Sequence, residues 1–290
     1  AKRRKDPNRL SQLEEIRAER FDLMEQLSLL PDDLTFYTQI TMEAAEDVSF
    51  LKAMKKAGIK GALVGIEAVT PEGLKDVYKD FNLAGEQLVT RLKTFRKHGV
   101  HILGSFIFGL PSDRPSTFDA TVSLAKRADI AFAQFVTLTP FPGTIDFEQW
   151  EREVGDDMPK VDEIPISRHW LIPQAKRPKL FAPHPAMSAE EIRQRTQKVW
   201  DQFYSVKAVW QRSNVVKSLR ARIAFLLISK LYRQMYANTG LSTDSARVSR
   251  STKWARLMAK PVQRLFAAEP MPDLKVPSRP KALAEPTEAA

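Results

Sequence analysis

The 290-residue sequence contains no cysteine. This absence excludes disulfide bonds, thiolate zinc sites and a thiolate-held iron–sulfur cluster within the chain. Long apolar runs are absent as well, because the longest, Ile223 to Ile228, is far shorter than the roughly 18 residues that span a bilayer. The basic start of the chain, Lys2 to Lys5, is not followed by the apolar core of a secretory signal. We therefore expect a cytoplasmic protein.

Acidic residues are scarce in one segment. Residues 205–264 carry thirteen Lys or Arg and one acid, Asp244, a net charge of +12, whereas the whole chain carries +10. The remaining residues therefore sum to −2. The basic segment fits three roles, which are a solvated helix face, an anionic membrane surface at the cytoplasmic face, or a nucleic-acid contact. No recognised nucleic-acid module is present, and apolar residues lie among the cations: Phe225, Leu226, Leu227, Ile228, Trp254, Leu257 and Met258.

Strand-like and helix-like patterns alternate in the first half of the chain. Apolar, β-branched or aromatic runs predict strands over 34–42, 61–67, 100–108 and 130–138. Periodic segments between them predict helices over 46–57, 85–98 and 115–128, and a helix starts near Pro71. Regular strand–helix alternation implies parallel strands with right-handed crossovers. The sequence therefore predicts an α/β fold.

The remaining segments give the expected division of the chain. Residues 1–33 hold an N-terminal helix, 34–147 the alternating α/β part, and 148–187 a proline-rich loop segment that also carries His169 and His184. Residues 188–266 form a basic helical extension, with helices over 188–212 and 214–237. The last segment, 267–290, is rich in Pro, Ala and Glu and is expected to be disordered.

Polar residues follow the predicted strands at the ends where barrel enzymes carry their chemistry. Thr41 and Glu43, then Glu67, then Gly109, then Thr139 stand at these positions. Glu67 is the sharpest candidate, because it terminates an apolar strand where a carboxylate is costly to bury unless it is paired. A ribose diol or an ammonium group would satisfy it. The structural alternative is that Glu67 caps the next helix or meets a lysine.

Two other strand ends have both a functional and a packing interpretation. Ser105, Ile107 and Gly109 alternate along one strand face, where they line a site or simply pack tightly, with Gly allowing close backbone approach. The loop from Thr139 to Thr144 has two prolines, a glycine and Phe141, and fits either stacking on a planar base or a rigid strand exit.

Two common site types are not expected. His98 and His101 are separated by the Gly99 break, so a shared helical face that binds a metal is not expected. No Gly-x-Gly-x-x-Gly follows a strand, so a Rossmann dinucleotide site is not supported.

Four ordered segments carry a family resemblance. Phe36–Thr41, Gly65–Glu67, Gly104–Pro111 and Thr139–Thr144 together resemble the later strands of radical S-adenosylmethionine (SAM) enzymes, most closely members with an N-terminal cobalamin-binding domain. Two tail segments, 168–170 and 230–236, are similar to tails in that family. The resemblance implies a partial TIM-like (β/α) radical SAM barrel made of about its third to sixth strands, followed by a mainly helical C-terminal extension.

The resemblance also assigns roles to residues. It implies that Glu67 contacts the SAM ribose and that the fifth-strand motif of Ser105, Ile107 and Gly109 contacts the adenine side. Thr139 and Phe141 would lie near the adenine and the substrate. The substrate-lining residues would be Tyr37, Gln39, Thr41 and Glu43.

The chain departs from the family where the metal is held. Family members bind a [4Fe–4S] cluster through a Cys-x3-Cys-x2-Cys loop, which this sequence lacks. We expect no catalytic or metal-binding residue in this chain, which would be the C-terminal part of a longer enzyme. The cluster and cobalamin are expected only in the full-length protein, so this part alone would be inactive. Two unpaired strand edges would make it poorly soluble.

Two classes of function follow from the sequence. The first is part of a cobalamin-dependent radical SAM enzyme, with methyltransferase-like chemistry on an unactivated carbon of a small-molecule or lipid substrate. The alternative is a non-catalytic, barrel-like binding or scaffold protein whose basic tail, residues 205–264, binds a membrane surface.

Overall fold

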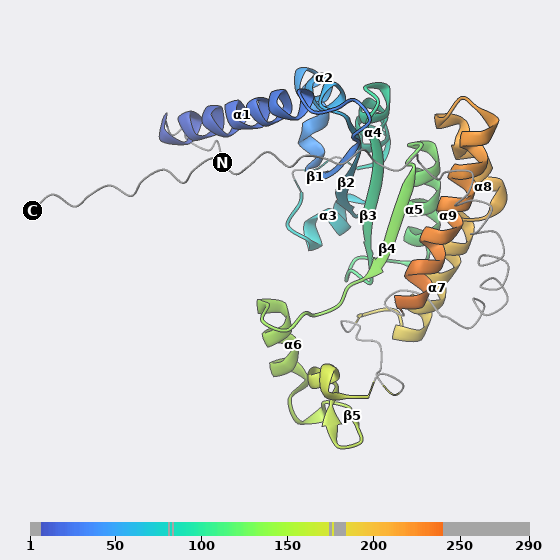
Figure 1. The fold of residues 1–290 in the computed structure, drawn as a ribbon. Coiled ribbons are helices and arrows are strands. Elements are labelled where there is room, and N and C mark those ends of the chain that lie inside the picture. The colour runs from blue at the N-terminus through green and yellow to red at the C-terminus, as the bar shows by residue number, and fades with distance from the viewer. Residues whose placement is uncertain (1–6, 81, 83, 174–175, 177–183, 240–290) are drawn as a thin grey trace, which may run out of the picture. The chain divides into compact units, whose positions relative to one another are not determined.

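Four strands form a parallel sheet in the computed structural model (Figure 1). They are β1 (Phe36–Ile40), β2 (Ile59–Glu67), β3 (His101–Phe108) and β4 (Phe132–Thr137), and they are adjacent in this order. The structure describes residues 7–80, 82, 84–173, 176 and 184–239. The predicted α/β class and the parallel strands are confirmed.

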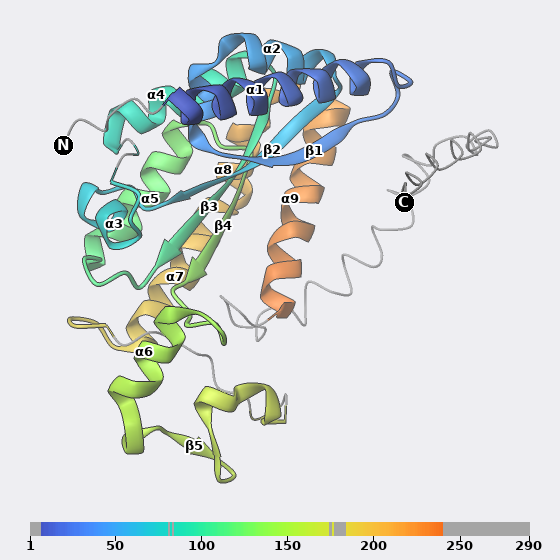
Figure 2. The same cartoon turned by 90° about the vertical axis from the view of Figure 1, so that its left-hand side faces the viewer.

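Helices cover one face of the sheet. The connecting helices α2 (Val48–Lys56), α4 (Gly85–Lys97) and α5 (Pro115–Arg127) lie on the same side as α7 (Ala189–Phe203), as Figures 1 and 2 show. Helix α2 packs on β2, α4 on β3 and α7 on β4. The strand residues beneath these helices are buried because every second side chain points to this face: Ala62, Val64, Ile66, Ile102, Phe106, Phe108, Ala133 and Phe135.

The opposite face of the sheet is more open. Its side chains belong to the alternate strand residues, such as Leu63, Leu103 and Val136, which are partly exposed. Helix α9 (Leu219–Thr239) reaches this face at β4, where the Phe132 ring lies 5.5 Å from the ring of Tyr232 (Figure 2). We call this surface the open face.

Helix α7 and its C-cap residue bond the outer edge of β4. Nε1 of Trp200 donates to the carbonyl of Phe135 at 2.9 Å. The Tyr204 hydroxyl donates to the carbonyl of Ala133 at 2.7 Å and accepts from its N–H at 3.0 Å. These side chains satisfy backbone groups that an edge strand otherwise exposes. The expectation of two unpaired strand edges is therefore wrong for β4.

The segment after β4 is more ordered than predicted. Helix α6 (Ile145–Val154) begins at Thr144, whose hydroxyl accepts a hydrogen bond from the Phe147 N–H. The 3-10 helices η2 (Gly155–Asp157) and η3 (Ile166–Leu171) flank a short antiparallel hairpin, β5 (Lys160–Val161) and β6 (Ile164–Pro165). Phe147, Trp150 and Met158 form a small core of their own. The predicted loop character of 148–187 is therefore wrong for the part from 148 to 171.

The predicted helix over 188–212 is two helices. Helix α7 ends at Phe203, and α8 spans Val206–Arg212. The break falls at Ser205, because its side chain accepts from the Ala208 N–H and caps the second helix. The 3-10 helix η5 (Ser213–Val215) then leads to α9.

The first helix is peripheral. Helix α1 (Pro7–Ser28) packs on α2, where the Phe21 and Phe50 rings meet edge to face with centroids 5.6 Å apart. The short elements η1 (Met42–Glu46) and α3 (Pro71–Asp76) follow β1 and β2. Residues 240–266 of the predicted extension and the tail 267–290, predicted to be disordered, lie outside the described residues. No helix within the described ranges is long and apolar enough to cross a membrane.

Candidate functional site

The carboxyl ends of β2, β3 and β4 meet at one edge of the sheet. Ala68 after β2, Leu74 in α3 and Leu110 after β3 form a buried cluster, and Ile107 and Leu138 pack against it. Neighbouring strands lie about 4.8 Å apart. The structure therefore brings the chain segments that contain Glu67, Gly109 and Thr139 to one edge, as expected from their places in the sequence.

Glu67 ends β2 in a conformation that is unusual for its residue type. Its φ angle is 64°, in the left-handed region, and the pairing with β3 is irregular between Gly65 and Glu67. A Cβ atom at Gly65 would lie 2.4 Å from Oε1 of Glu67, so glycine there lets the carboxylate fold back over the strand. Left-handed backbone costs a non-glycine residue about 1–2 kcal/mol.

The Glu67 carboxylate has a lysine partner. Nζ of Lys79 donates to its Oε1 at 2.7 Å, and 15% of the Glu67 side chain is exposed. The structure thus shows the structural alternative that the sequence left open, in which Glu67 meets a lysine. A carboxylate has about four acceptor sites, so this contact leaves acceptor capacity for a ligand hydroxyl.

Ser105 lies on the open face of β3. Nε2 of Gln134 on β4 donates to the Ser105 Oγ at 2.8 Å, and the Tyr236 hydroxyl on α9 donates to Oε1 of Gln134. The sequence prediction included neither Gln134 nor Tyr236. A signal for Gln134 was present, since it is the one polar side chain in the apolar run 130–136.

Ile107 and Gly109 have structural roles. Ile107 packs against the strand-end cluster. Gly109 has a φ of +90°, which favours glycine. The N–H groups of Gly109 and Leu110 donate to Oδ2 of Asp113 at 2.8 and 3.1 Å. Burial raises the pKa of Asp113, although these two hydrogen bonds act in the opposite direction.

The loop after β4 presents an aromatic ring. The Thr139 hydroxyl donates to the Thr137 carbonyl at 3.1 Å, and the Thr144 hydroxyl donates to the Phe141 carbonyl at 2.7 Å. Phe141 itself is 64% exposed. The loop is closed by its own hydrogen bonds, and the ring is accessible to a planar ligand.

Tyr37 and Gln39 lie on β1, with their side chains on the open face. The Tyr37 ring lies across Gly61, where a Cβ atom would be 2.2 Å from its Cε2. Tyr37 is 57% exposed as a residue, and the partial burial of its phenol group raises its pKa. Gln39 is exposed.

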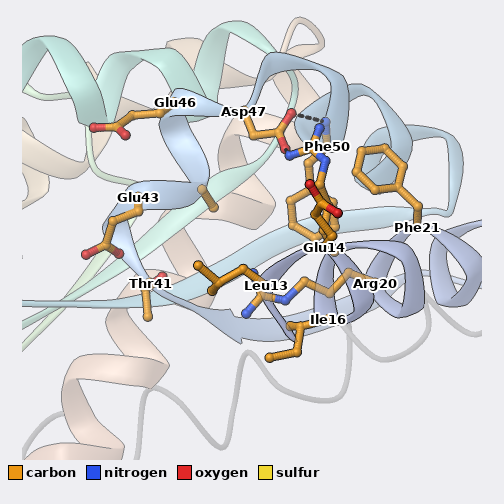
Figure 3. A pocket seen from close by; sticks show the side chains of 12 residues that line it. Leu13, Glu14, Ile16, Arg20, Phe21, Thr41, Glu43, Glu46, Asp47 and Phe50 are labelled. Carbon is orange, nitrogen blue, oxygen red and sulfur yellow. Dashed lines mark hydrogen bonds and ion pairs between the residues drawn. The ribbon is translucent and has the colours of Figure 1, made fainter. Parts of the chain in front are cut away.

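Thr41 and Glu43 line a different feature. A groove of about 740 Å³ lies between α1 and the segment from Thr41 to Phe50 (Figure 3). Charged side chains of both signs line it, together with apolar ones: Leu13, Glu14, Ile16, Arg17, Arg20, Phe21, Thr41, Glu43, Ala44, Glu46, Asp47 and Phe50. Thr41 and Glu43 therefore line this groove, whereas Tyr37 and Gln39 lie on the open face.

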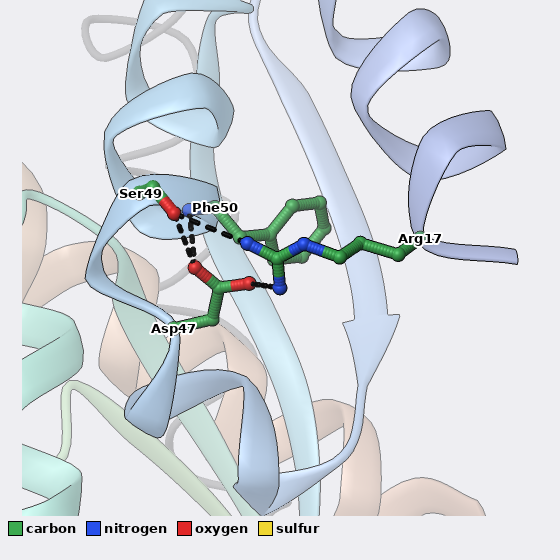
Figure 4. Close-up of polar contacts among 4 residues, drawn as sticks. All are labelled: Arg17, Asp47, Ser49 and Phe50. Atoms are coloured by element: carbon green, nitrogen blue, oxygen red, sulfur yellow. Dashed lines mark hydrogen bonds and ion pairs between the residues drawn. The ribbon is translucent and has the colours of Figure 1, made fainter. Parts of the chain in front are cut away.

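An ion pair fastens α1 beside the groove. Arg17 pairs with Asp47 and donates to Oγ of Ser49 at 3.3 Å, as Figure 4 shows. The Phe50 N–H and the Ser49 hydroxyl donate to the other carboxylate oxygen, at 3.0 and 2.5 Å. Desolvation alone would raise the pKa of Asp47, but these bonds and Arg17 hold it below its usual value. One wall of the groove is thus the N-cap of α2, which the Arg17–Asp47 ion pair joins to α1.

The residues of this chain do not fit an iron–sulfur cluster. The sequence has no cysteine to supply thiolate ligands, and within the described ranges no three His, Asp or Glu side chains group as metal ligands. We therefore assign no cluster chemistry to residues of this chain.

The chain is similar in sequence to several methyltransferases. It is 37% identical over 107 residues to an uncharacterized methyltransferase of Pyrococcus horikoshii, covering 37% of this chain and 22% of that protein. It is 30% identical over 134 residues to bacteriochlorophyllide d C-8(2)-methyltransferase of Chlorobaculum tepidum, covering 46% and 30%. Hopanoid C-2 methylase of Rhodopseudomonas palustris is 26% identical over 122 residues, covering 41% and 23%.

No protein-family model matches the chain. Among solved structures, the radical S-adenosylmethionine methyltransferase TsrM from Kitasatospora setae superposes with a TM-score of 0.49 at 16% identity, covering 73% of this chain and 49% of that one.

The chain spans about a fifth to a third of the length of the curated relatives it matches. Those relatives are enzymes, so the predicted resemblance to enzymes is confirmed. The curated relatives are methyltransferases by name, and the strand-end motifs of this chain resemble those of the cobalamin-binding-domain subgroup of the radical SAM superfamily.

Proposed function

We propose that this chain supplies the nucleoside-binding part of a cobalamin-dependent radical SAM methyltransferase. The observation that carries the proposal is the meeting of three strand ends that bring Glu67, Gly109 and Thr139 to one edge of a parallel sheet. The similarity to methyltransferases supports the reaction class. In this proposal the sheet is the later part of a partial (β/α) barrel, and its strands are about the third to sixth.

Glu67 at this edge, Ser105 on the open face and Phe141 in the loop after β4 offer three contacts that suit an adenosine group. The Glu67 carboxylate accepts hydrogen bonds from vicinal hydroxyls of a ribose. The Ser105 hydroxyl, which accepts from Gln134, keeps its own proton to donate to a ligand on the open face. The exposed ring of Phe141 offers an apolar face to a planar base. Ile107 and Gly109 then shape the site through packing and backbone turn.

The cluster and cobalamin are expected outside the residues of this chain. In such an enzyme the reduced cluster would cleave SAM to a 5′-deoxyadenosyl radical, which would remove a hydrogen atom from the substrate carbon, and methylcobalamin would supply the methyl group to that carbon. This chain's own residues bind and orient the nucleoside and line the substrate. The relatives act on a bacteriochlorophyllide and a hopanoid by name, and we propose a small-molecule or lipid substrate here.

Nucleoside binding by this chain tests the proposal. We expect adenosine and SAM to shift the backbone amide NMR signals of Glu67 and Ser105, and Glu67→Gln to weaken binding about tenfold, because a hydrogen bond to a charged group contributes about 1.5–3 kcal/mol. Glu72→Gln, an exposed carboxylate in α3, is the matched control. Failure of both ligands to bind would favour the alternative of a binding or scaffold protein.

A further inference from the structure

The described part of the C-terminal extension contains basic residues and no acidic ones. Residues 205–239 contain seven basic residues and no Asp or Glu: Lys207, Arg212, Lys217, Arg220, Arg222, Lys230 and Arg233. Arg212 is buried, and Arg233 is paired with Asp201 at 3.2 Å. Three of the exposed members, Lys207, Lys217 and Arg220, lie on α8, on the connection to α9 and on the first turn of α9, and exposed Lys230 lies farther along α9.

Large apolar side chains are exposed among these cations. Leu219 is 63% exposed, Ile223 47% and Trp210 37%. Single exposed apolar residues are ordinary. Here they alternate with lysine and arginine over one helix–turn–helix, which is the composition of segments that lie in a bilayer interface. We define the α8–α9 surface as Lys207, Trp210, Lys217, Leu219, Arg220 and Ile223.

Arg222 holds this surface in one conformation. Its guanidinium lies 4.2 Å over the Trp210 ring, and its Nε donates to the Ser213 Oγ at 2.8 Å. A further bond joins Arg222 to the Trp210 carbonyl at 3.2 Å. The start of α9 is thereby fastened to the end of α8. Indole rings that keep one part exposed favour the bilayer interface, where their apolar and polar parts are both satisfied.

A neighbouring helix adds positive charge near the same place. Lys126 stands in the last turn of α5 and is exposed. Partial burial of its ammonium group and the positive charge of Arg212 lower the pKa of Lys126, so the charges of α5 and α8 act on one another. This field attracts anions and is complementary to acidic lipid headgroups.

We propose that the α8–α9 surface binds an anionic lipid bilayer, with its cations at the headgroups and Trp210, Leu219 and Ile223 in the interface. Along α9, Phe225 contacts Phe132 at the start of β4, and Tyr236 contacts Gln134 farther along that strand. The surface precedes Phe225 and so lies toward the amino ends of the strands. Bilayer contact there leaves the edge with Glu67 accessible. The inference does not depend on nucleoside binding.

Vesicle co-sedimentation of the 290-residue chain tests this surface. We expect the chain to sediment with vesicles that mix phosphatidylcholine and phosphatidylglycerol and to stay in the supernatant with phosphatidylcholine alone. The double variant Lys207→Ala/Lys217→Ala should bind the mixed vesicles at least about tenfold more weakly, since each cation near an anionic surface contributes on the order of a fivefold factor. Lys93→Ala/Lys160→Ala, which removes two exposed lysines elsewhere, is the matched control.

A second readout locates the contact. Lipids brominated on their acyl chains should quench part of the tryptophan fluorescence of the chain, and Trp210→Phe should remove that part. Circular dichroism verifies that each variant keeps its helices. Unchanged sedimentation of the double variant would overturn the proposal, even if another segment attaches the chain to vesicles. Binding to duplex DNA without binding to anionic vesicles would overturn it as well.

Discussion

The hydroxyl of Tyr236 on α9 donates a hydrogen bond to Oε1 of Gln134 on β4, 102 positions earlier in the chain. This bond makes the amide oxygen the acceptor, so Nε2 is the group that faces Ser105, where it donates at 2.8 Å. A residue of α9 therefore determines the hydrogen-bonding state of a hydroxyl on the open face of β3.

Tyr236→Phe should weaken this connection. The ring stays and the acceptor Oε1 loses its partner, so we expect the free energy of unfolding to fall by about 1 kcal/mol. Urea denaturation measures the change. Tyr78→Phe, at a residue that is 88% exposed, serves as the control and should leave stability unchanged. Equal stability of the Tyr236 variant and the parent would show that the bond contributes nothing.

Glu67→Gly separates a structural from a functional role of this carboxylate. Glycine removes the cost of the left-handed backbone, about 1–2 kcal/mol, and loses the part-exposed pair with Lys79, which contributes about 0–1 kcal/mol. We expect a variant that is at least as stable to heat as the parent yet binds nucleosides more weakly. Clear destabilisation would instead indicate that Glu67 serves the fold.

Tyr204→Phe should release the edge of β4. The variant keeps the stacked ring, whose centroid lies 5.4 Å from that of Trp200, and leaves the N–H and carbonyl of Ala133 without their partner. A buried unsatisfied group costs about 1–3 kcal/mol. Hydrogen exchange gives a local measurement, since the Ala133 amide should exchange faster. The Ala131 amide, which donates to the Ile102 carbonyl inside the sheet, should stay protected.

Acid should destabilise the fold through His101. Burial and the charge of Arg96 lower its pKa below 6.5 in the folded chain. Because the unfolded state binds the proton more readily, the stabilisation is complete above pH of about 6.5 and is lost as the pH falls through that value toward the folded pKa. Denaturation between pH of about 7.5 and 5.5 should show a smaller loss in His101→Gln. An equal loss in both proteins would contradict this assignment.

The positions of the strands along the chain and their carboxyl ends could be predicted because both follow from local patterns. Apolar runs gave β2 and β3 within two residues of their observed limits. The helix break at Ser205 and the start of α6 at Thr144 depend on capping hydroxyls, which apolar periodicity does not report.

The partners of the site residues could not be predicted in the same way. Lys79 lies beyond α3, and nothing in its sequence neighbourhood distinguishes it from other lysines as the partner of Glu67. The contact of Tyr236 with Gln134 depends on where α9 packs. Such pairs arise from tertiary packing, so single-sequence patterns identify at most one member.

The side chains that cap the edge of β4 determine at which edge the sheet can add a strand. Trp200 and Tyr204 occupy outward backbone groups of Phe135 and Ala133, so another strand that pairs with β4 must first displace two buried aromatic side chains. β1, at the other end of the sheet, has β2 as its one strand neighbour in the described part of the chain. Sheet extension, whether by a partner strand or by aggregation, is therefore favoured along β1.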